Sequence, residues 1–227
     1  MPPAHPTTPV IDPGDGGDYQ PDVTASDFVD GIDNPYMPWI VGSRWVYEGT
    51  SDGEPERVEV AVLDKTKKVM GVAATVVHDT VYVNDELVED TYDWFAQDRE
   101  GNVWYLGEAV EDLEDGKVVS TEGSWEAGVD GAQPGIVMPA APAKGDVFRQ
   151  EFLEDTAEDM AEIIATGGSA TVSAGTYDGV IKTRDWTPLE PEVIEEKSYA
   201  PAVGFIAEVH TAGGTGSIEL VSFTPGP

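Results

Sequence analysis

From Tyr36 to the C-terminus, apolar and polar residues alternate with a period of two over short runs. In Arg57–Leu63, for example, Val58, Val60 and Val62 are separated by other residues, which is typical of a strand with one buried face. Turn residues such as Asp115-Gly116 separate the runs. We predict strands over Arg44–Thr50, Arg57–Leu63, Lys68–Val83, Leu87–Gln97, Asn102–Glu108, Lys117–Glu122, Asp146–Glu151, Ala170–Ser173, Tyr177–Trp186, Val193–Tyr199, Val203–His210 and Ser217–Phe223. The pattern predicts a mainly β fold, either an antiparallel curved sheet or a lipocalin-like barrel.

One segment has a helical pattern instead. Apolar residues in Thr156–Thr166 recur at spacings that form a stripe along one helix face, from Ala157 to Ile164. Thr156 and Asp159 resemble a capping box, and Gly167 provides a stop. The sequence therefore predicts one short helix near residues 156–166.

The first 33 residues differ in composition from the rest of the chain. They are rich in Pro, Gly, Asp and Thr, contain seven acidic residues, and have no Lys or Arg. Such a segment has little apolar surface to offset the entropy of ordering it. We predict a disordered acidic tether over residues 1–33, followed by a single β-barrel-like domain over residues 34–227.

Charge limits the partners of this chain. The 44 Asp and Glu residues and 12 Lys and Arg residues give a formal net charge of −32. Phosphate backbones and anionic lipids would be repelled, so neither nucleic acid nor membrane insertion is expected. We expect a monomer that is secreted or tethered at the cell surface, with a lipid anchor at a removed N-terminus as one option. Adaptation to high salt is an alternative explanation of the acidity.

Several motifs resemble a known group of proteins. Asn34–Trp39 and Gly42–Gly49 together form the pattern Tyr-x-Pro followed by Gly-x-x-Trp-x-Tyr. Further matching segments are Asp93–Asp98, Gly101–Tyr105, Gly123–Gly128, Arg149–Glu151, Ala157–Asp159, Lys182–Trp186 and Gly204–Phe205. On these segments the chain resembles an uncharacterised group of bacterial extracytoplasmic, lipoprotein-like β-rich proteins. The resemblance implies a β fold and an exported location, and it implies no catalytic residue because the group has no established activity.

A predicted hairpin provides the candidate ligand site. If Asp98–Gly101 is a four-residue loop, Gln97 faces Asn102 and Phe95 faces Trp104. One face then combines aromatic rings with carboxylates and amides, as sites for small polar ligands often do. The predicted ligand residues on this face are Asp93, Phe95, Gln97, Trp104 and Glu108. The alternative is that this face is simply the solvent side of the sheet.

Two further sets of charged residues are candidates. Arg149 and Lys182 lie in predicted strands, where each either forms a cross-strand ion pair or points inward to hold an anionic ligand group. Glu151, Asp155 and Asp159 are a candidate cation site, for which Ca²⁺ is the ion considered, although helix capping accounts for part of this acidity. No other cofactor is predicted.

Three functions remain open from the sequence. The leading hypothesis is an exported, acidic β-rich module that binds a small ligand or a cation without catalysis. The first alternative is a hydrolase or lyase that uses carboxylates, which would need at least one desolvated carboxyl with a raised pKa. The second alternative is a structural or adhesive surface protein.

Overall fold

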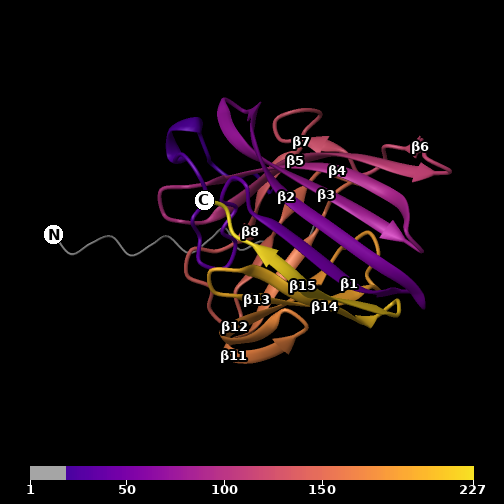
Figure 1. The fold of residues 1–227 in the computed structure, drawn as a ribbon. Helices are drawn as coiled ribbons and strands as arrows, with labels where there is room; N and C mark the ends of the chain where they lie inside the picture. The colour runs from indigo at the N-terminus through magenta and orange to yellow at the C-terminus, as the bar shows by residue number, and fades with distance from the viewer. Residues whose placement is uncertain (1–18) are drawn as a thin grey trace.

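The structure is a computed structural model that describes residues 19–227 (Figure 1). Its elements, in chain order, are a short 3₁₀ turn η1 (Ala25–Asp27) and the strands β1 (Arg44–Ser51), β2 (Glu54–Val69), β3 (Val72–Val83), β4 (Glu86–Gln97), β5 (Val103–Glu114), β6 (Lys117–Ser120), β7 (Trp125–Glu126), β8 (Gln133–Met138), β9 (Val147–Arg149), β10 (Glu151–Phe152), β11 (Met160–Val172), β12 (Gly175–Trp186), β13 (Ile194–Ala200), β14 (Gly204–Ala212) and β15 (Gly216–Thr224). No helix within residues 19–227 is long and apolar enough to cross a membrane.

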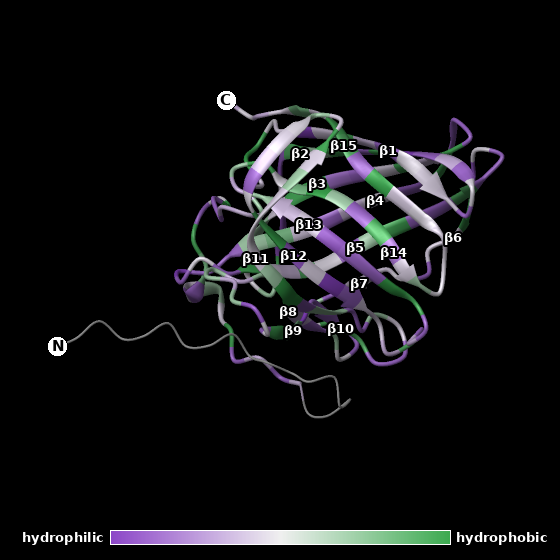
Figure 2. Cartoon of the chain, turned by 90° about the horizontal axis from the view of Figure 1, so that it is seen from below, coloured by the Kyte–Doolittle hydropathy of each residue, from purple (hydrophilic) through white to green (hydrophobic). Residues whose placement is uncertain are grey.

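The strands form one antiparallel sheet with the order β10-β8-β5-β4-β3-β2-β1-β15-β14-β13-β12-β11-β9, and β6 and β7 pair with β5 beside this path. The sheet curls, so that β1–β4 and β11–β13 lie on opposite sides of the molecule (Figure 1). The curled sheet buries one face of these strands, because Trp45 and Tyr47 on β1, like Val58, Val60 and Val62 on β2, are buried while their neighbours are less so. Hydrophobic and hydrophilic residues alternate along the strands in Figure 2. The predicted mainly β, curved antiparallel sheet is confirmed.

The two ends of the sheet meet at a seam formed by residues 149–151. β9 pairs with β11 at one end of the sheet, and β10 pairs with β8 at the other end. Gln150 joins β9 to β10, and Gly135 on β8 packs directly against its backbone: a Cβ on Gly135 would lie 2.2 Å from the Gln150 carbonyl carbon. The covalent chain thus connects the two ends of the sheet at Gln150.

The segment between residues 34 and 40 packs against one end of the curled sheet. The indole of Trp39 packs edge-on against Trp45 at a centroid distance of 5.1 Å, and it also contacts Phe95 at 5.7 Å. The Tyr36 hydroxyl donates a hydrogen bond to the Gly179 carbonyl at 3.1 Å. These contacts place Trp39 over the interior, where it becomes part of the site described below.

The predicted helix near residues 156–166 is wrong. Residues 160–172 form strand β11, and residues 153–157 form a tight turn closed by the Leu153–Ala157 bridge. Met160 and Ala161 point to opposite faces of the sheet, yet both are buried. A strand buried on both faces lacks strict alternation, so its apolar run resembles a helical stripe.

Residues 19–33 are described by the structure and lie against the sheet, whereas the predicted tether extends to residue 33. The Tyr19 hydroxyl donates a hydrogen bond to the Pro134 carbonyl at 2.9 Å, and Ile32 is buried. Phe28 forms an antiparallel bridge with Asp98. A few apolar anchors and backbone hydrogen bonds thus hold an acidic segment of low hydrophobicity. The rest of the predicted tether, residues 1–18, lies outside the described residues.

Candidate functional site

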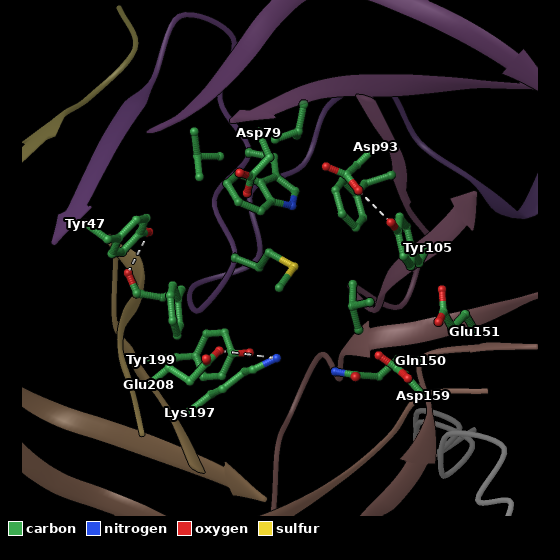
Figure 3. Close-up of a pocket in the computed structure, with 17 residues that line it drawn as sticks. Tyr47, Asp79, Asp93, Tyr105, Gln150, Glu151, Asp159, Lys197, Tyr199 and Glu208 are labelled. Atoms are coloured by element: carbon green, nitrogen blue, oxygen red, sulfur yellow. Dashed lines mark hydrogen bonds and ion pairs between the residues drawn. The ribbon is translucent and has the colours of Figure 1, made fainter. Parts of the chain in front are cut away.

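A cavity of about 270 Å³, here called the inner pocket, lies within the curl of the sheet. Figure 3 shows Asp79, Asp93 and Tyr105 on one side of the pocket and Lys197, Tyr199 and Glu208 on another. Its walls combine aromatic and aliphatic side chains with five carboxyl groups and one lysine. The lining residues are Met37, Trp39, Tyr47, Val60, Val77, Asp79, Asp93, Phe95, Tyr105, Val137, Gln150, Glu151, Asp159, Lys197, Tyr199, Phe205 and Glu208.

A group of three carboxyls lies on β3, β4 and β5. Asp79 Oδ1 is buried and has no hydrogen-bond partner among the described residues. Burial, reinforced by the nearby charge of Asp93, raises the pKa of Asp79 well above its usual value. Burial also raises the pKa of Asp93 to about 7, although the Tyr105 hydroxyl donates a hydrogen bond to this carboxyl at 2.5 Å. Burial raises the pKa of Glu108 to about 8. This wall therefore changes its charge near neutral pH.

A β-bulge positions these carboxyls. Asp93 pairs with Glu108, but beyond a register shift Phe95 pairs with Tyr105. Gly107, inside the shift, has φ of +135°, and a Cβ there would lie 2.4 Å from the Trp125 carbonyl oxygen, so only glycine fits. The predicted pairing, in which Phe95 faces Trp104, is wrong because the hairpin loop is one residue longer than predicted: Gln97 pairs with Val103 and not with Asn102. As a result, Tyr105 rather than Trp104 faces the interior.

Lys197 on β13 is the cation of the inner pocket. Its ammonium lies 3.2 Å from Glu195, 3.6 Å from Glu208 and 3.8 Å from Asp185. Burial by itself would lower the pKa of Lys197, but these three carboxylates outweigh it and raise the pKa well above its usual value. The lysine therefore stays charged, and its charge is already balanced by its neighbours. It leaves the carboxyls on the opposite wall uncompensated.

Glu195, Glu208 and His210 also have a spacing that suits a metal ion, because one ligand atom from each lies within 4.8 Å of the others. However, the Lys197 ammonium already contacts both glutamates. The His210 ring lies 3.4 Å from Glu195. We therefore interpret this cluster as a network of ion pairs.

The structure separates the predicted hairpin residues. Asp93 and Phe95 line the inner pocket, and Glu108 lies beside Asp93. Gln97 instead accepts hydrogen bonds from the backbone amides of Asp33 and Asn34, both at 2.9 Å. Trp104 donates a hydrogen bond to Asp98 at 2.8 Å. Gln97 and Trp104 therefore fix the N-terminal segment and the hairpin loop, outside the pocket.

Neither predicted cation lines the inner pocket. Arg149 is 1% exposed and lies over the rings of Phe152 and Tyr19, at 4.6 and 5.5 Å from their centroids. Lys182 is only half-buried on β12, on the face opposite Thr183, which is buried. Arg149, Lys182, Arg184 and Lys197 all lie in predicted strands, and nothing in the sequence distinguishes Lys197 among them.

A second depression of about 530 Å³, here called the outer pocket, gathers the predicted cation ligands Glu151, Asp155 and Asp159. The remaining lining residues are Thr121, Glu122, Gly123, Ser124, Thr156, Ala157, Glu158, Thr187, Leu189 and Glu190. Glu151 and Asp159 line both pockets. These two carboxyls therefore lie between the inner and the outer pocket.

No family model and no curated protein sequence matches the chain. Two solved structures are similar to it. One is a protein from Bacteroides fragilis, described as presumed to be exported and as having a YmcC-like fold, with 14% identity, a TM-score of 0.48, and coverage of 88% of this chain and 100% of its own. The other is a presumed lipoprotein from Parabacteroides distasonis, with 15% identity, a TM-score of 0.40, and coverage of 86% and 100%. Neither likeness assigns a residue or an activity. The family resemblance inferred from the Tyr-x-Pro and Gly-x-x-Trp-x-Tyr pattern stays a prediction.

Proposed function

We propose that this chain is a binding module that works outside the cytoplasm and holds a small organic cation in its inner pocket. The single observation that carries the proposal is Asp79, whose Oδ1 is buried in the pocket wall with no hydrogen-bond donor among the described residues. A buried carboxylate without a partner is costly. A ligand ammonium would supply both the missing donor and the missing charge.

The composition of the walls supports a cation over an anion or a neutral ligand. Five carboxyls line the pocket, and its one lysine is balanced by Asp185, Glu195 and Glu208. Aromatic rings from Trp39, Phe95 and other residues form much of the rest, and rings attract cations through their π faces. The volume of about 270 Å³ lies just below the range typical of drug-sized ligands, so the ligand is small.

The binding test compares phenethylammonium with 2-phenylethanol, which has nearly the same shape and no charge. We expect phenethylammonium to change tryptophan fluorescence, because Trp39 lines the pocket, and to raise the melting temperature. Since the ammonium favours ionised carboxyls, its affinity is expected to increase as the pH rises from 6 to 8. Equal binding of the alcohol would contradict the proposal.

The variant Asp79→Asn tests the residue that carries the proposal. Removing one charged hydrogen-bond acceptor is expected to weaken phenethylammonium binding by roughly 10- to 100-fold. The control Asp178→Asn makes the same chemical change at an exposed position of β12 and should leave the affinity unchanged. If the two variants bind equally well, Asp79 does not contact the ligand.

A second candidate function, a carboxylate-dependent hydrolase or lyase, is favoured by one specific observation. Asp93 and Glu108 are paired across β4 and β5 and have pKa values of about 7 and 8, in the range that suits general acids and bases at neutral pH. If this function holds, a panel of chromogenic glycosides and esters should yield a substrate whose turnover falls at least about 100-fold in Asp93→Asn. Undiminished turnover in that variant would exclude Asp93 as the acid or base.

A further inference from the structure

We infer that the outer pocket binds a divalent cation of the Ca²⁺ type between the carboxylates of Glu151 and Asp159. The site is distinct from the organic-cation site proposed above, although the two share these residues at their boundary. The inference is carried by the charge of the pocket and by one unpartnered oxygen atom.

The residues that line the outer pocket offer only oxygen ligands. Six of them are acidic, four carry hydroxyl groups, and neither Lys nor Arg is among them. The acidic residues are Glu122, Glu151, Asp155, Glu158, Asp159 and Glu190, and the hydroxyl residues are Thr121, Ser124, Thr156 and Thr187. Hard divalent cations prefer carboxylate, hydroxyl and carbonyl oxygens together with water.

Glu151 provides the independent sign of a missing ligand. Its side chain lines the pocket and is only 7% exposed, yet its Oε2 has no hydrogen-bond partner among the described residues. A carboxylate oxygen in this situation is destabilised unless a cation or a donor reaches it.

The fold brings the two proposed ligands together although they are eight positions apart. The chain turns back at the Leu153–Ala157 bridge, and the Gln150 amide donates a hydrogen bond to the Asp159 carbonyl at 2.7 Å. Asp159 is exposed at the pocket and Glu151 is buried in its wall. Ca²⁺ accepts six to eight ligands in flexible geometry, whereas Mg²⁺ demands a near-ideal octahedron, and the irregular pocket therefore suits Ca²⁺ better.

Because Glu151 and Asp159 also line the inner pocket, an ion between them would reduce the negative potential there. Ca²⁺ should therefore weaken the binding of phenethylammonium, and phenethylammonium should weaken the binding of Ca²⁺ by the same factor. This coupling rests on the proposed function, whereas the Ca²⁺ site itself does not.

The test is a calorimetric titration of the full chain with CaCl₂ alone, in 150 mM NaCl so that diffuse attraction to the acidic surface is screened. We expect one saturable site per chain, and a melting temperature raised by roughly 5–10 °C at a hundredfold excess over Kd. Glu151→Gln and Asp159→Asn should each weaken the affinity at least about tenfold, because charge count sets affinity. Asp178→Asn, exposed on β12, should bind as the unaltered chain does.

Three results would overturn the inference: no saturable binding, full affinity in both Glu151→Gln and Asp159→Asn, or a thermal shift with Mg²⁺ as large as that with Ca²⁺. Glu151→Gln should fold normally, because it replaces a carboxyl with a raised pKa by a neutral group of the same shape. Since no amine is present in this titration, its failure leaves the proposal for the inner pocket intact. Failure of the amine to bind would likewise leave the Ca²⁺ site intact.

Discussion

Acidification from pH 8 to pH 5.5 is expected to stabilise this protein and to raise its melting temperature by about 10 °C. Burial raises the pKa of Asp93 from 3.8 to about 7 and that of Glu108 from 4.5 to about 8. The folded state therefore binds protons more tightly than the unfolded state, and stability falls as the pH rises through these values. Between pH 8 and pH 5.5 the pH falls only about 1.5 units below the raised pKa of Asp93, so at about 1.4 kcal/mol per unit this residue contributes about 2 kcal/mol, or roughly 4–8 °C in a chain of this size. Protonation of Glu108 over the same pH range supplies the rest of the expected shift.

The contribution of Glu108 overlaps with that of Asp93, because the charge of Asp93 is one cause of the raised pKa of Glu108. Asp27 has the opposite sign, since its hydrogen bonds with Thr24 lower its pKa, but it is fully exposed and its effect on stability is small. Thermal unfolding followed by circular dichroism across this pH range measures the effect. Asp93→Asn keeps an acceptor for the Tyr105 hydroxyl, so it should stabilise the protein at pH 8 and flatten the pH dependence. A melting temperature that falls on acidification to pH 5.5 would show that these carboxyls are ionised in the folded state.

Gly135→Ala is expected to destabilise the protein by at least about 3 kcal/mol, because the added methyl group overlaps backbone atoms that would have to move. The new Cβ would lie 2.2 Å from both the carbonyl carbon and the oxygen of Gln150, and 2.6 Å from the Arg149 carbonyl oxygen. These are main-chain atoms at the seam, so no side chain can rotate away. The melting temperature should fall by roughly 6–12 °C.

Gly168→Ala on β11 is the matched control for this substitution. A Cβ there lies 3.7 Å from the Val180 carbonyl oxygen, which is ordinary van der Waals contact. The stability of this variant should change by less than about 1 kcal/mol, since alanine in a strand costs no more than glycine. If both variants melt at the same temperature, the ends of the sheet are not in tight contact at Gly135.

Alternation was sufficient to predict most of the strands, because strands such as β1 and β2 have one buried face over much of their length. Alternation failed where both faces of a strand are buried, as in the first residues of β11, whose apolar pattern resembles that of a helix. The predicted strand Lys68–Val83 is in fact the end of β2 and all of β3, separated by a turn at Met70 and Gly71. Only long-range pairing reveals such short turns and the very short strands β7 and β10.

The candidate site was predicted in part because Asp93 and Phe95 share one face of β4. The bulge at Gly107 could not be anticipated, since the sequence shows a glycine but not the close approach of the Trp125 carbonyl oxygen. Asp79 and Lys197 were missed for a different reason. Among 44 acidic residues and several strand cations, only the curl of the sheet determines which side chains meet.

At the seam, Gln150 has two separate roles, one for its backbone and one for its side chain. Its amide donates a hydrogen bond to the Asp159 carbonyl and its own carbonyl packs against Gly135 of β8, whereas its side chain reaches the inner pocket and lies 3.3 Å from Asp185. The structural contacts at this position therefore involve only backbone atoms, and every amino acid except proline has both the amide N–H and the carbonyl. A substitution at position 150 would therefore change the lining of the inner pocket while leaving this main-chain contact in place.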